Sequence, residues 1–376
     1  MKSERRIRLI VGISDFRIGG AQKVVADLIN HFDKTKFKIH LLTFFDSANE
    51  ENFFNEIDPE ILIHKLSFKN FYDIKSIFLL YKLLKNIDAD VVWSHLFFSN
   101  TLIRVLKPLF RFRVVIVEHN TYVYRTKIEK IVNYILSFVT FKIVAVSNYV
   151  AKYTSKDESI SLRKFVVIHN GVDTKKLIVQ PNPTLKDSLY RELGFSYSSK
   201  FFLNIGQLTT QKNQKLLVEA FSLVTKIYPE YKLVILGEGN LRKELEALVS
   251  NLDLTQRVIM PGIKKDVVRY YAASHCFVLS SDFEGFPIVA IEALVSGLPI
   301  ISTPVSASDV YVSDGRNGFI ARQSSKESLA EKMCRICEME EKELDAFRSV
   351  SKEISTEFDI ADVVKRYESL LVEASS

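Results

Sequence analysis

Cysteine is scarce in this sequence, with three residues among 376. Three cysteines cannot form the disulfide framework of a small secreted domain, so we expect a reducing compartment. Two of them, Cys334 and Cys337, form a C-x-x-C, but they lie in a charged helical pattern from Lys326 to Glu343. A redox motif normally follows a strand, and no second pair is present. We interpret these two cysteines as small apolar residues on one helix face.

Glycine and proline are also few, at 13 and 9 residues, which excludes collagen-like repeats and argues against long flexible linkers. Long apolar runs are missing too. The longest apolar stretch, Ile131 to Val150, is interrupted by Asn133 and Lys142, whereas a spanning helix needs roughly 20 apolar residues. The first apolar run ends at Asp15, which suits a buried strand better than a signal peptide. A content of 47% hydrophobic and 26% charged residues is that of a globular protein and excludes general disorder.

Positive charge is concentrated in the first half of the chain. Residues 1–195 contain 30 Lys+Arg and 20 Asp+Glu, a net +10, and the remainder is −4. Residues 61–142 alone contain 13 against 5, interleaved with aromatic residues such as Tyr72, Phe78 and Phe110. This pattern is typical of surfaces that bind anionic lipids and also of those that bind nucleic acid. Solvated lysines beside core aromatics would produce it equally well.

Short apolar runs alternate with helical patterns from end to end, which predicts parallel sheets flanked by helices. The length suggests two or three domains. The predicted strands are Ile7–Ile13, Lys38–Phe44, Ile61–Leu66, Asp90–Ser94, Arg113–Glu118, Lys142–Ser147, Phe165–His169, Phe201–Ile205, Lys232–Leu236, Val258–Met260, Cys276–Leu279 and Pro299–Ser302.

The fold class predicted by this order is α/β, with two doubly wound, Rossmann-like domains. We place the boundary at the Pro-rich stretch Gln180–Thr184, giving domains 1–180 and 181–355. Residues 356–376 contain an amphipathic helix, Ile360–Val372, that we expect to pack back on the first domain. Such pairs of domains bind ligands in the cleft between them.

The stretch Ser280–Leu294 is the most informative. It follows a strand and opens a helix, and Pro287 suits the first helical turn. The backbone N–H groups around Phe286, Pro287 and Ile288 would face a ligand above the sheet, and phosphate suits that position. Glu284 and Glu292 are two turns apart and could accept hydrogen bonds from polyol hydroxyls at two points. Alternatively, both carboxylates only stabilise the positive end of the helix.

These residues resemble a known family. Glu284 to Glu292 matches the E-x7-E motif of retaining glycosyltransferases of family 4, which have the GT-B fold. Five further segments are similar to that family: Asn204–Asn213, Leu236–Leu241, Met260–Gly262, Asn170–Asp173 and Gly19–Gln22. The resemblance covers nearly the whole chain and is more specific in the second half.

The resemblance implies roles for residues of the second half. Lys212 would bind the donor diphosphate and neutralise the charge that grows as the nucleotide leaves. Glu292 would hold the ribose hydroxyls, and Glu284 those of the donor sugar. The remaining implied contacts, which would flank the base, are Gly237, Gly239 and Gly262.

In the first half, the resemblance places Gly19 and Gly20 beside the phosphates, because glycine lets backbone N–H groups approach closely. It places His119 near the reacting sugar. One departure from the family is Gln207, which stands where a second cation on the diphosphate, an arginine, is usual. Arg17 and Lys215 are the candidates to replace that charge.

Three other patterns are weaker. Asp88-Ala-Asp90 has the D-x-D spacing of a metal site, but it precedes a strand, whereas ligands in such sheets lie beyond the carboxyl end. The pair Gly237-x-Gly239 lacks the third glycine of a dinucleotide fingerprint. His95 ends a predicted strand and is either an acceptor contact or a structural histidine.

The sequence therefore predicts a retaining, metal-independent glycosyltransferase with no cofactor. It would move a hexose or N-acetylhexosamine from a nucleotide diphosphate sugar, with UDP favoured, to a glycan or polyprenyl-linked glycan. We expect it at the inner face of the plasma membrane, bound peripherally to anionic lipid and not to nucleic acid. Alternatives are a nucleotide-sugar epimerase, a dinucleotide-dependent dehydrogenase, disfavoured by the lack of G-x-G-x-x-G, and an inactive sugar-binding subunit, suggested by Gln207.

Overall fold

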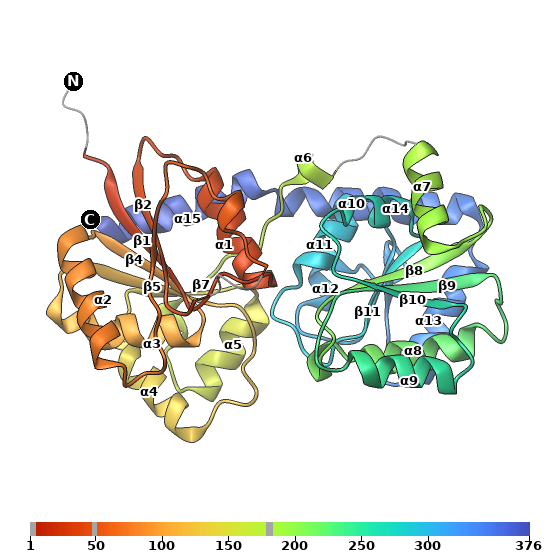
Figure 1. Cartoon of the computed structure of the whole chain (residues 1–376), viewed down its shortest axis with the longest axis horizontal. Helices are drawn as coiled ribbons and strands as arrows, with labels where there is room; N and C mark the ends of the chain where they lie inside the picture. Colours follow the sequence, from red (N-terminus) through yellow and green to blue (C-terminus); the bar gives the residue numbers. More distant parts are fainter. Residues whose placement is uncertain (1–4, 47–50, 178–182) are drawn as a thin grey trace. The chain divides into compact units, whose positions relative to one another are not determined.

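The computed structural model describes residues 5–46, 51–177 and 183–376. The chain divides into two compact units, Met1–Val172 with Ile360–Ser376, and Asp173–Asp359. Figure 1 labels their helices and strands. Part of the Pro-rich stretch at which the sequence predicts the boundary, residues 180–182, lies outside the described residues.

The first unit contains a seven-stranded parallel sheet in the order β3-β2-β1-β4-β5-β6-β7. Its strands are β1 (Ile7–Ile13), β2 (Phe37–Thr43), β3 (Leu62–Lys65), β4 (Val91–His95), β5 (Arg113–Glu118), β6 (Lys142–Ala145) and β7 (Phe165–Val167). The central strands are buried on both faces, as expected for parallel strands covered by helices on both sides. The strand order reverses between β1 and β4, and such sheets bind ligands at the carboxyl ends of these strands.

Helices cover this sheet. They are α1 (Gly20–His31), α2 (Ile74–Ile87), α3 (Phe97–Leu106), α4 (Lys127–Ser137), α5 (Asn148–Asp157) and α15 (Ile360–Ser375), with 3-10 turns η1 (Phe54–Glu56), η2 (Lys107–Leu109) and η3 (Leu162–Lys164). The C-terminal helix α15 packs against α1, β4 and β5, so the expected return of this helix to the first domain is confirmed. Tyr367 of α15 lies against Trp93 of β4, with ring centroids 4.9 Å apart.

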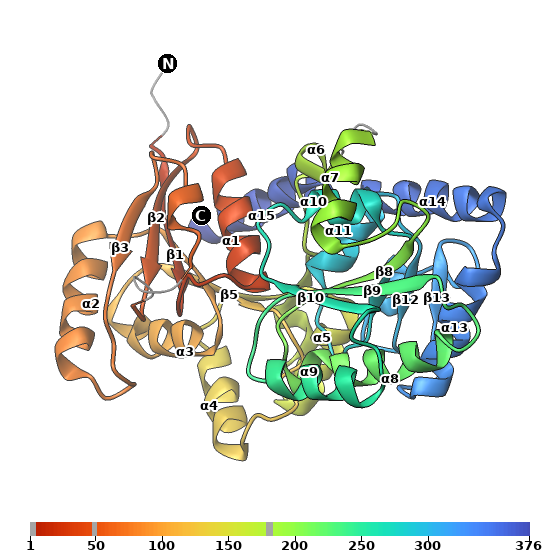
Figure 2. The ribbon, with the colours of Figure 1, turned by 45° about the vertical axis from the view of Figure 1, so that its right-hand side comes forward.

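The second unit contains a six-stranded parallel sheet in the order β10-β9-β8-β11-β12-β13. Its strands are β8 (Lys200–Ile205), β9 (Tyr231–Leu236), β10 (Val258–Gly262), β11 (Cys276–Leu279), β12 (Ile300–Ser302) and β13 (Gly318–Ile320). Its helices are α6 (Thr174–Leu177), α7 (Pro183–Leu193), α8 (Gln214–Val224), α9 (Arg242–Asn251), α10 (Val268–Ala273), α11 (Ile288–Val295), α12 (Ser308–Tyr311), α13 (Lys326–Glu338) and α14 (Glu341–Ser355), with 3-10 turns η4 (Thr210–Lys212) and η5 (Thr356–Phe358). Figure 2 shows β8, β9 and β10 side by side in this unit, as their hydrogen-bond registers require.

The predicted fold class, two doubly wound α/β domains, is confirmed. The structure accounts for two of the weaker sequence patterns by contacts within the fold. Asp88 and Asp90 both bind Arg8, through Nη1 at 2.9 Å and Nη2 at 3.2 Å respectively. Cys334 and Cys337 lie on α13 and pack against the core of the second unit as free thiols.

Candidate functional site

An ion pair between Lys212 and Glu284 lies at the carboxyl edge of the second sheet. Lys212 ends η4, which follows β8, and Glu284 lies in the loop between β11 and α11. Lys212 Nζ is 2.6 Å from Glu284 Oε1, and Ser281 Oγ donates to the same oxygen, also at 2.6 Å. Glu284 is buried, while about a quarter of the Lys212 side chain (23%) remains exposed. The Lys212 ammonium group therefore stays accessible to solvent, while the Glu284 carboxylate is held in place by Ser281.

Hydrogen bonds from side chains and backbone hold the two loops together. Gln211 Nε2 donates to the carbonyl of Phe283 at 3.0 Å, and the N–H of Asp282 donates to the carbonyl of Gln211 at 2.9 Å. Asn213 joins α8 to the same loop, because its Oδ1 caps the N–H of Leu216 while its Nδ2 donates to Asp282 Oδ1. Such bonds fix the Lys212 and Glu284 backbones relative to each other, so their contact is built into the fold.

Glu292 lies about one turn into α11 and is buried. The hydroxyl of Tyr271, on α10, donates to Glu292 Oε2 at 2.9 Å and also contacts the carbonyl of Val289. Burial, and then the charge of Glu292, raise the pKa of Tyr271 well above its ordinary value. Tyr271 therefore stays a neutral phenol that orients the carboxylate.

Three loops after β8, β9 and β10 are packed too closely to admit side chains at two glycines. A Cβ at Gly237 would lie 2.0 Å from the carbonyl oxygen of Gly206, and one at Gly239 would lie 2.3 Å from that of Leu208. Gly237 also has φ +139°, and its N–H donates to the carbonyl of Gly262 at 3.0 Å. These contacts bring the three predicted base-flanking glycines together. Gln207 is exposed on the first of the three loops.

The start of α11 differs in one detail from the sequence prediction. Pro287 precedes the first helical residue, Ile288, instead of lying within the first turn; its φ of −75° and ψ of 115° are those of extended backbone. The side chain of Phe286 is buried against Phe358 and Tyr311. Phe286 can therefore meet a ligand only through its backbone, since its ring belongs to the core.

In the first unit, His119 follows β5 and contacts His95, the last residue of β4. A hydrogen bond of 2.9 Å joins His95 Nδ1 to His119 Nε2. Burial lowers the pKa of His119 to about 4 and that of His95 well below its ordinary value, so both rings are neutral at pH 7. His95 Nε2 is buried and has no partner among the described residues.

This unpaired nitrogen selects the tautomer. An N–H left unpaired in the interior is costlier than an unpaired acceptor, so the His95 proton belongs on Nδ1. His95 then donates to His119 Nε2, and the His119 proton is left on Nδ1. The sequence left two interpretations of His95 open, an acceptor contact and a structural histidine. The structure adds that its ring sets the tautomer of His119, a predicted site residue.

The N-terminal glycine pair lies at the start of α1. Gly19 precedes the helix with φ −169°, and a Cβ at Gly20 would meet no atom of the described residues within 4 Å. The described part of the chain therefore leaves open space at Gly20. Arg17, a predicted replacement for the missing arginine, is half exposed and pairs with Asp15. Lys215, the other candidate, is exposed on α8.

Sequence reasoning missed the residues that hold the two glutamates. Ser281 was within the motif stretch, and its position three residues before Glu284 was the only available signal. Tyr271 lies 21 residues before Glu292, and Ser306, whose hydroxyl donates to the Glu284 carbonyl, lies 22 residues after Glu284. No local pattern links residues so far apart.

Two family descriptions match this chain. Residues 18–176 match "Glycosyltransferase Family 4", and residues 186–353 match "Glycosyl transferases group 1". The chain belongs to the family 4 glycosyltransferases. The sequence-based recognition is thereby confirmed, and the predicted site residues other than Arg17 lie within the two matched regions.

Relatives of this glycosyltransferase come from several organisms. An uncharacterized glycosyltransferase of Methanocaldococcus jannaschii is 31% identical over 243 residues, which are 56% of this chain and only 58% of that protein. The N-acetylgalactosamine-N,N'-diacetylbacillosaminyl-diphospho-undecaprenol 4-alpha-N-acetylgalactosaminyltransferase of Campylobacter jejuni is 27% identical over 92% of this chain and 94% of its own. HepE of Anabaena, solved with UDP-glucose, has a TM-score of 0.86 over 98% of this chain and 100% of its own, at 17% identity. That likeness shows the GT-B fold.

Proposed function

We propose that this glycosyltransferase moves a hexose or N-acetylhexosamine from a UDP-sugar to a lipid-linked glycan, with retention of configuration at the anomeric carbon. The observation that carries the proposal is the Lys212–Glu284 pair at the carboxyl edge of the second sheet. In this pair a cation lies within one hydrogen bond of the carboxylate that we assign to the donor sugar, beside the start of α11.

In the proposed reaction, the bond between the anomeric carbon and the phosphate oxygen breaks. The acceptor hydroxyl forms its bond on the same face, and its proton passes to the departing diphosphate. Lys212 and the backbone N–H groups at the start of α11 would stabilise the charge that grows on the leaving group. Glu284 would hold sugar hydroxyls and Glu292 the ribose.

The UDP donor and the lipid-linked acceptor are suggested by relatives. The Escherichia coli relative, 27% identical over 70% of this chain, is a UDP-Gal:alpha-D-GlcNAc-diphosphoundecaprenol alpha-1,3-galactosyltransferase. The name of the C. jejuni relative also includes a diphospho-undecaprenol acceptor. Since polyprenyl chains reside in a bilayer, we propose that this enzyme reaches its acceptor at the inner face of the membrane by peripheral binding.

The basic segment 61–142 has some of the exposed aromatic side chains that peripheral membrane binding would use. Its residues Phe68, Phe98 and Phe112 are buried in the core, as the simpler interpretation of the segment requires. Tyr72 and Phe78 are exposed, however, at 88% and 54%. None of the helices in the described part of the chain is long and apolar enough to span a membrane.

Calorimetric titration with UDP, GDP and ADP tests the donor, and we expect UDP to bind most tightly. Transfer of labelled sugar from a UDP-sugar panel to a polyprenyl-diphosphate glycan then tests the reaction, with the product anomer read from NMR couplings. EDTA should leave the rate unchanged, because Lys212 supplies the positive charge. A product of inverted configuration, or UDP-sugar conversion without any acceptor, would contradict the proposal; the second result is that of an epimerase.

Two variants test the ion pair. Lys212→Ala and Glu284→Gln should each lower turnover at least about tenfold, since each removes a contact to the reacting sugar or its leaving group. Glu353→Gln, an exposed position on α14, is the matched control and should be neutral. Wild-type rates in either site variant would refute the assignment.

A further inference from the structure

Helix α4 has an apolar face that points to solvent. Its exposed apolar residues, with Tyr124 just before the helix and Phe138 just after it, form what we call the α4 stripe: Tyr124, Ile128, Ile131, Ile135 and Phe138. Ile128 is 74% and Phe138 70% exposed. Both views of the ribbon show α4 at the periphery of the first unit, beside α3 (Figures 1 and 2). The spacing of three and four residues from Ile128 to Phe138 places these four side chains on one face of the helix, and Tyr124 precedes it.

Two polar residues of the same helix point inward. Asn133 and Ser137 are the buried residues of α4, with Asn133 only 1% exposed. An amphipathic helix on a globular domain normally packs its apolar face on the core and turns its polar face to water. Helix α4 does the opposite, so its orientation requires a specific cause.

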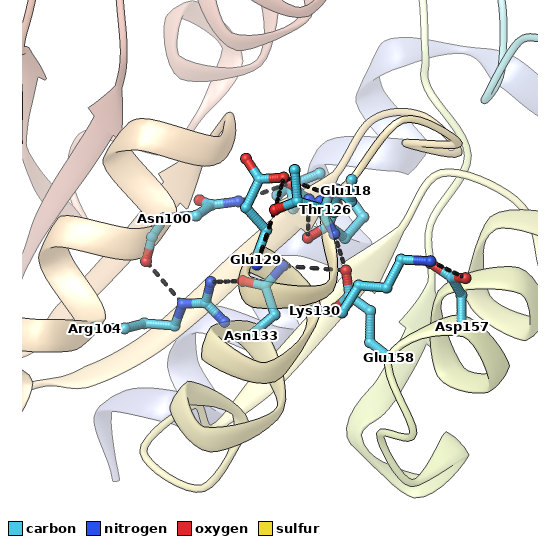
Figure 3. A network of polar contacts seen from close by, with 11 residues as sticks. Asn100, Arg104, Glu118, Thr126, Glu129, Lys130, Asn133, Asp157 and Glu158 are labelled. Atoms are coloured by element: carbon cyan, nitrogen blue, oxygen red, sulfur yellow. Dashed lines mark hydrogen bonds and ion pairs between the residues drawn. The ribbon is translucent and has the colours of Figure 1, made fainter.

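That cause is a buried network of polar contacts (Figure 3). Arg104 donates to Asn133 Oδ1 at 2.6 Å and to the carbonyl of Asn100 at 2.7 Å. Asn133 in turn donates to Glu158 Oε1 at 3.1 Å. Rotating α4 to bury the stripe would remove Asn133 from both partners and leave Arg104 and Glu158 buried with fewer hydrogen bonds, which is costly.

Contacts at the helix surface fix the same orientation. Thr126 and Glu129 form a reciprocal capping box at the start of α4. Lys130 Nζ lies 2.6 Å from Asp157 Oδ1 on α5. Lys130 pairs the charge of Asp157, and the capping box holds the Glu129 carboxylate on the backbone N–H and hydroxyl of Thr126.

The charges around the stripe favour an anionic partner. Lys127 on α4 and Lys152 and Lys156 on α5 are exposed, and among the described residues no ion pair involves them. The first unit as a whole has 28 Lys+Arg against 20 Asp+Glu, a net +8. A second copy of this chain would bring another +8 surface to the stripe, so charge complementarity favours lipid over self-association.

We propose that the α4 stripe is a membrane-docking surface, which enters the boundary between the headgroups and acyl chains of an anionic bilayer. The helix would lie in the plane of the interface, with its apolar side chains buried in lipid and the nearby lysines on the headgroups. This inference deepens the proposed function and rests on its lipid-bound acceptor. It adds that burial of apolar side chains contributes to docking. Salt screens the attraction between charges but not this contribution.

The test is sedimentation of the full chain with vesicles of phosphatidylglycerol and phosphatidylcholine. The double variant I131S/I135S should lower the vesicle partition coefficient at least about tenfold, because each isoleucine loses its transfer into an apolar phase. The matched control is Ile227→Ser, an isoleucine 64% exposed in the second unit, which should bind as the parent does. A separate variant, Ile128→Ser, should weaken binding to a smaller extent.

Unchanged partitioning of I131S/I135S would overturn the proposal. So would a parent that is dimeric in sedimentation velocity and becomes monomeric in the variant without loss of vesicle binding, since the stripe would then join two copies. UDP titration of the same variant separates this inference from the proposed function. The variant should bind UDP normally; if the parent itself binds no nucleotide, the proposed function fails while the vesicle result still decides the docking surface.

Discussion

Removal of the Arg125 side chain should destabilise the first unit severely. Arg125 Nη2 lies 3.0 Å from Glu118 Oε2, and its Nη1 pairs with Glu158. Both carboxylates and the guanidinium are nearly inaccessible, with side chains 2–7% exposed. Arg125→Met would leave two buried carboxylates without their cation, because Arg104 donates to Asn100 and Asn133 instead. Breaking a buried pair in this way costs about 3–5 kcal/mol.

The pH dependence of that cost has a definite sign. Burial, and next the charge of Glu118, raise the pKa of Glu158 from 4.5 to about 7. Between these two values the folded state holds a proton that the unfolded state has released. The contribution of Glu158 to stability is therefore full below pH 4.5 and is lost as the pH rises through 7. Without Arg125 the buried Glu158 carboxyl depends more on protonation, so Arg125→Met should be more destabilising at pH 8 than at pH 5.

The single tryptophan allows the first unit to be observed alone. Trp93 is buried in β4, so its fluorescence in a urea titration reports unfolding of that unit. With typical urea dependences, the expected loss shifts the midpoint by about 1–2 M. Lys130→Met, which breaks a partly exposed pair between α4 and α5, is the matched control and should cost about 0–1 kcal/mol. Equal midpoint shifts in the two variants, or no dependence on pH, would refute the reasoning.

Three further changes test the candidate site. His95→Phe should lower kcat with little change in the KM for donor, because His119 loses the N–H donor that sets its tautomer. His95→Gln should restore part of the rate. Equal kinetics of the two variants would show that His95 only fills space. If Arg17 supplies the missing cation, Arg17→Ala should slow turnover and Gln207→Arg should partly rescue it, whereas strict additivity in this double-mutant cycle would exclude the role. Gly239→Ala should weaken UDP binding in calorimetry, because its Cβ would collide with a carbonyl 2.3 Å away and force the loop to move; unchanged affinity would show that the loop does not bind nucleotide.

Much of the fold was predictable from the sequence because parallel strands buried on both faces appear as continuous apolar runs. The strands predicted at Ile7–Ile13 and Arg113–Glu118 have the same bounds in the structure. The motif from Glu284 to Glu292 was equally visible, since a loop and the helix that follows it are local in sequence. The family and the fold class follow from such local patterns.

Only the tertiary structure decided which side chains meet. Lys212 and Glu284 are 72 residues apart, and His95 and His119 are 24 apart, so their contacts depend on which strands become neighbours in the sheets. The orientation of α4 is the clearest case. Its sequence specifies one apolar and one polar face, but periodicity does not say which face packs inward. The inward face is determined by Arg104 of α3 and Glu158 at the end of α5. Both are buried, and Asn133 of α4 forms a hydrogen bond with each of them.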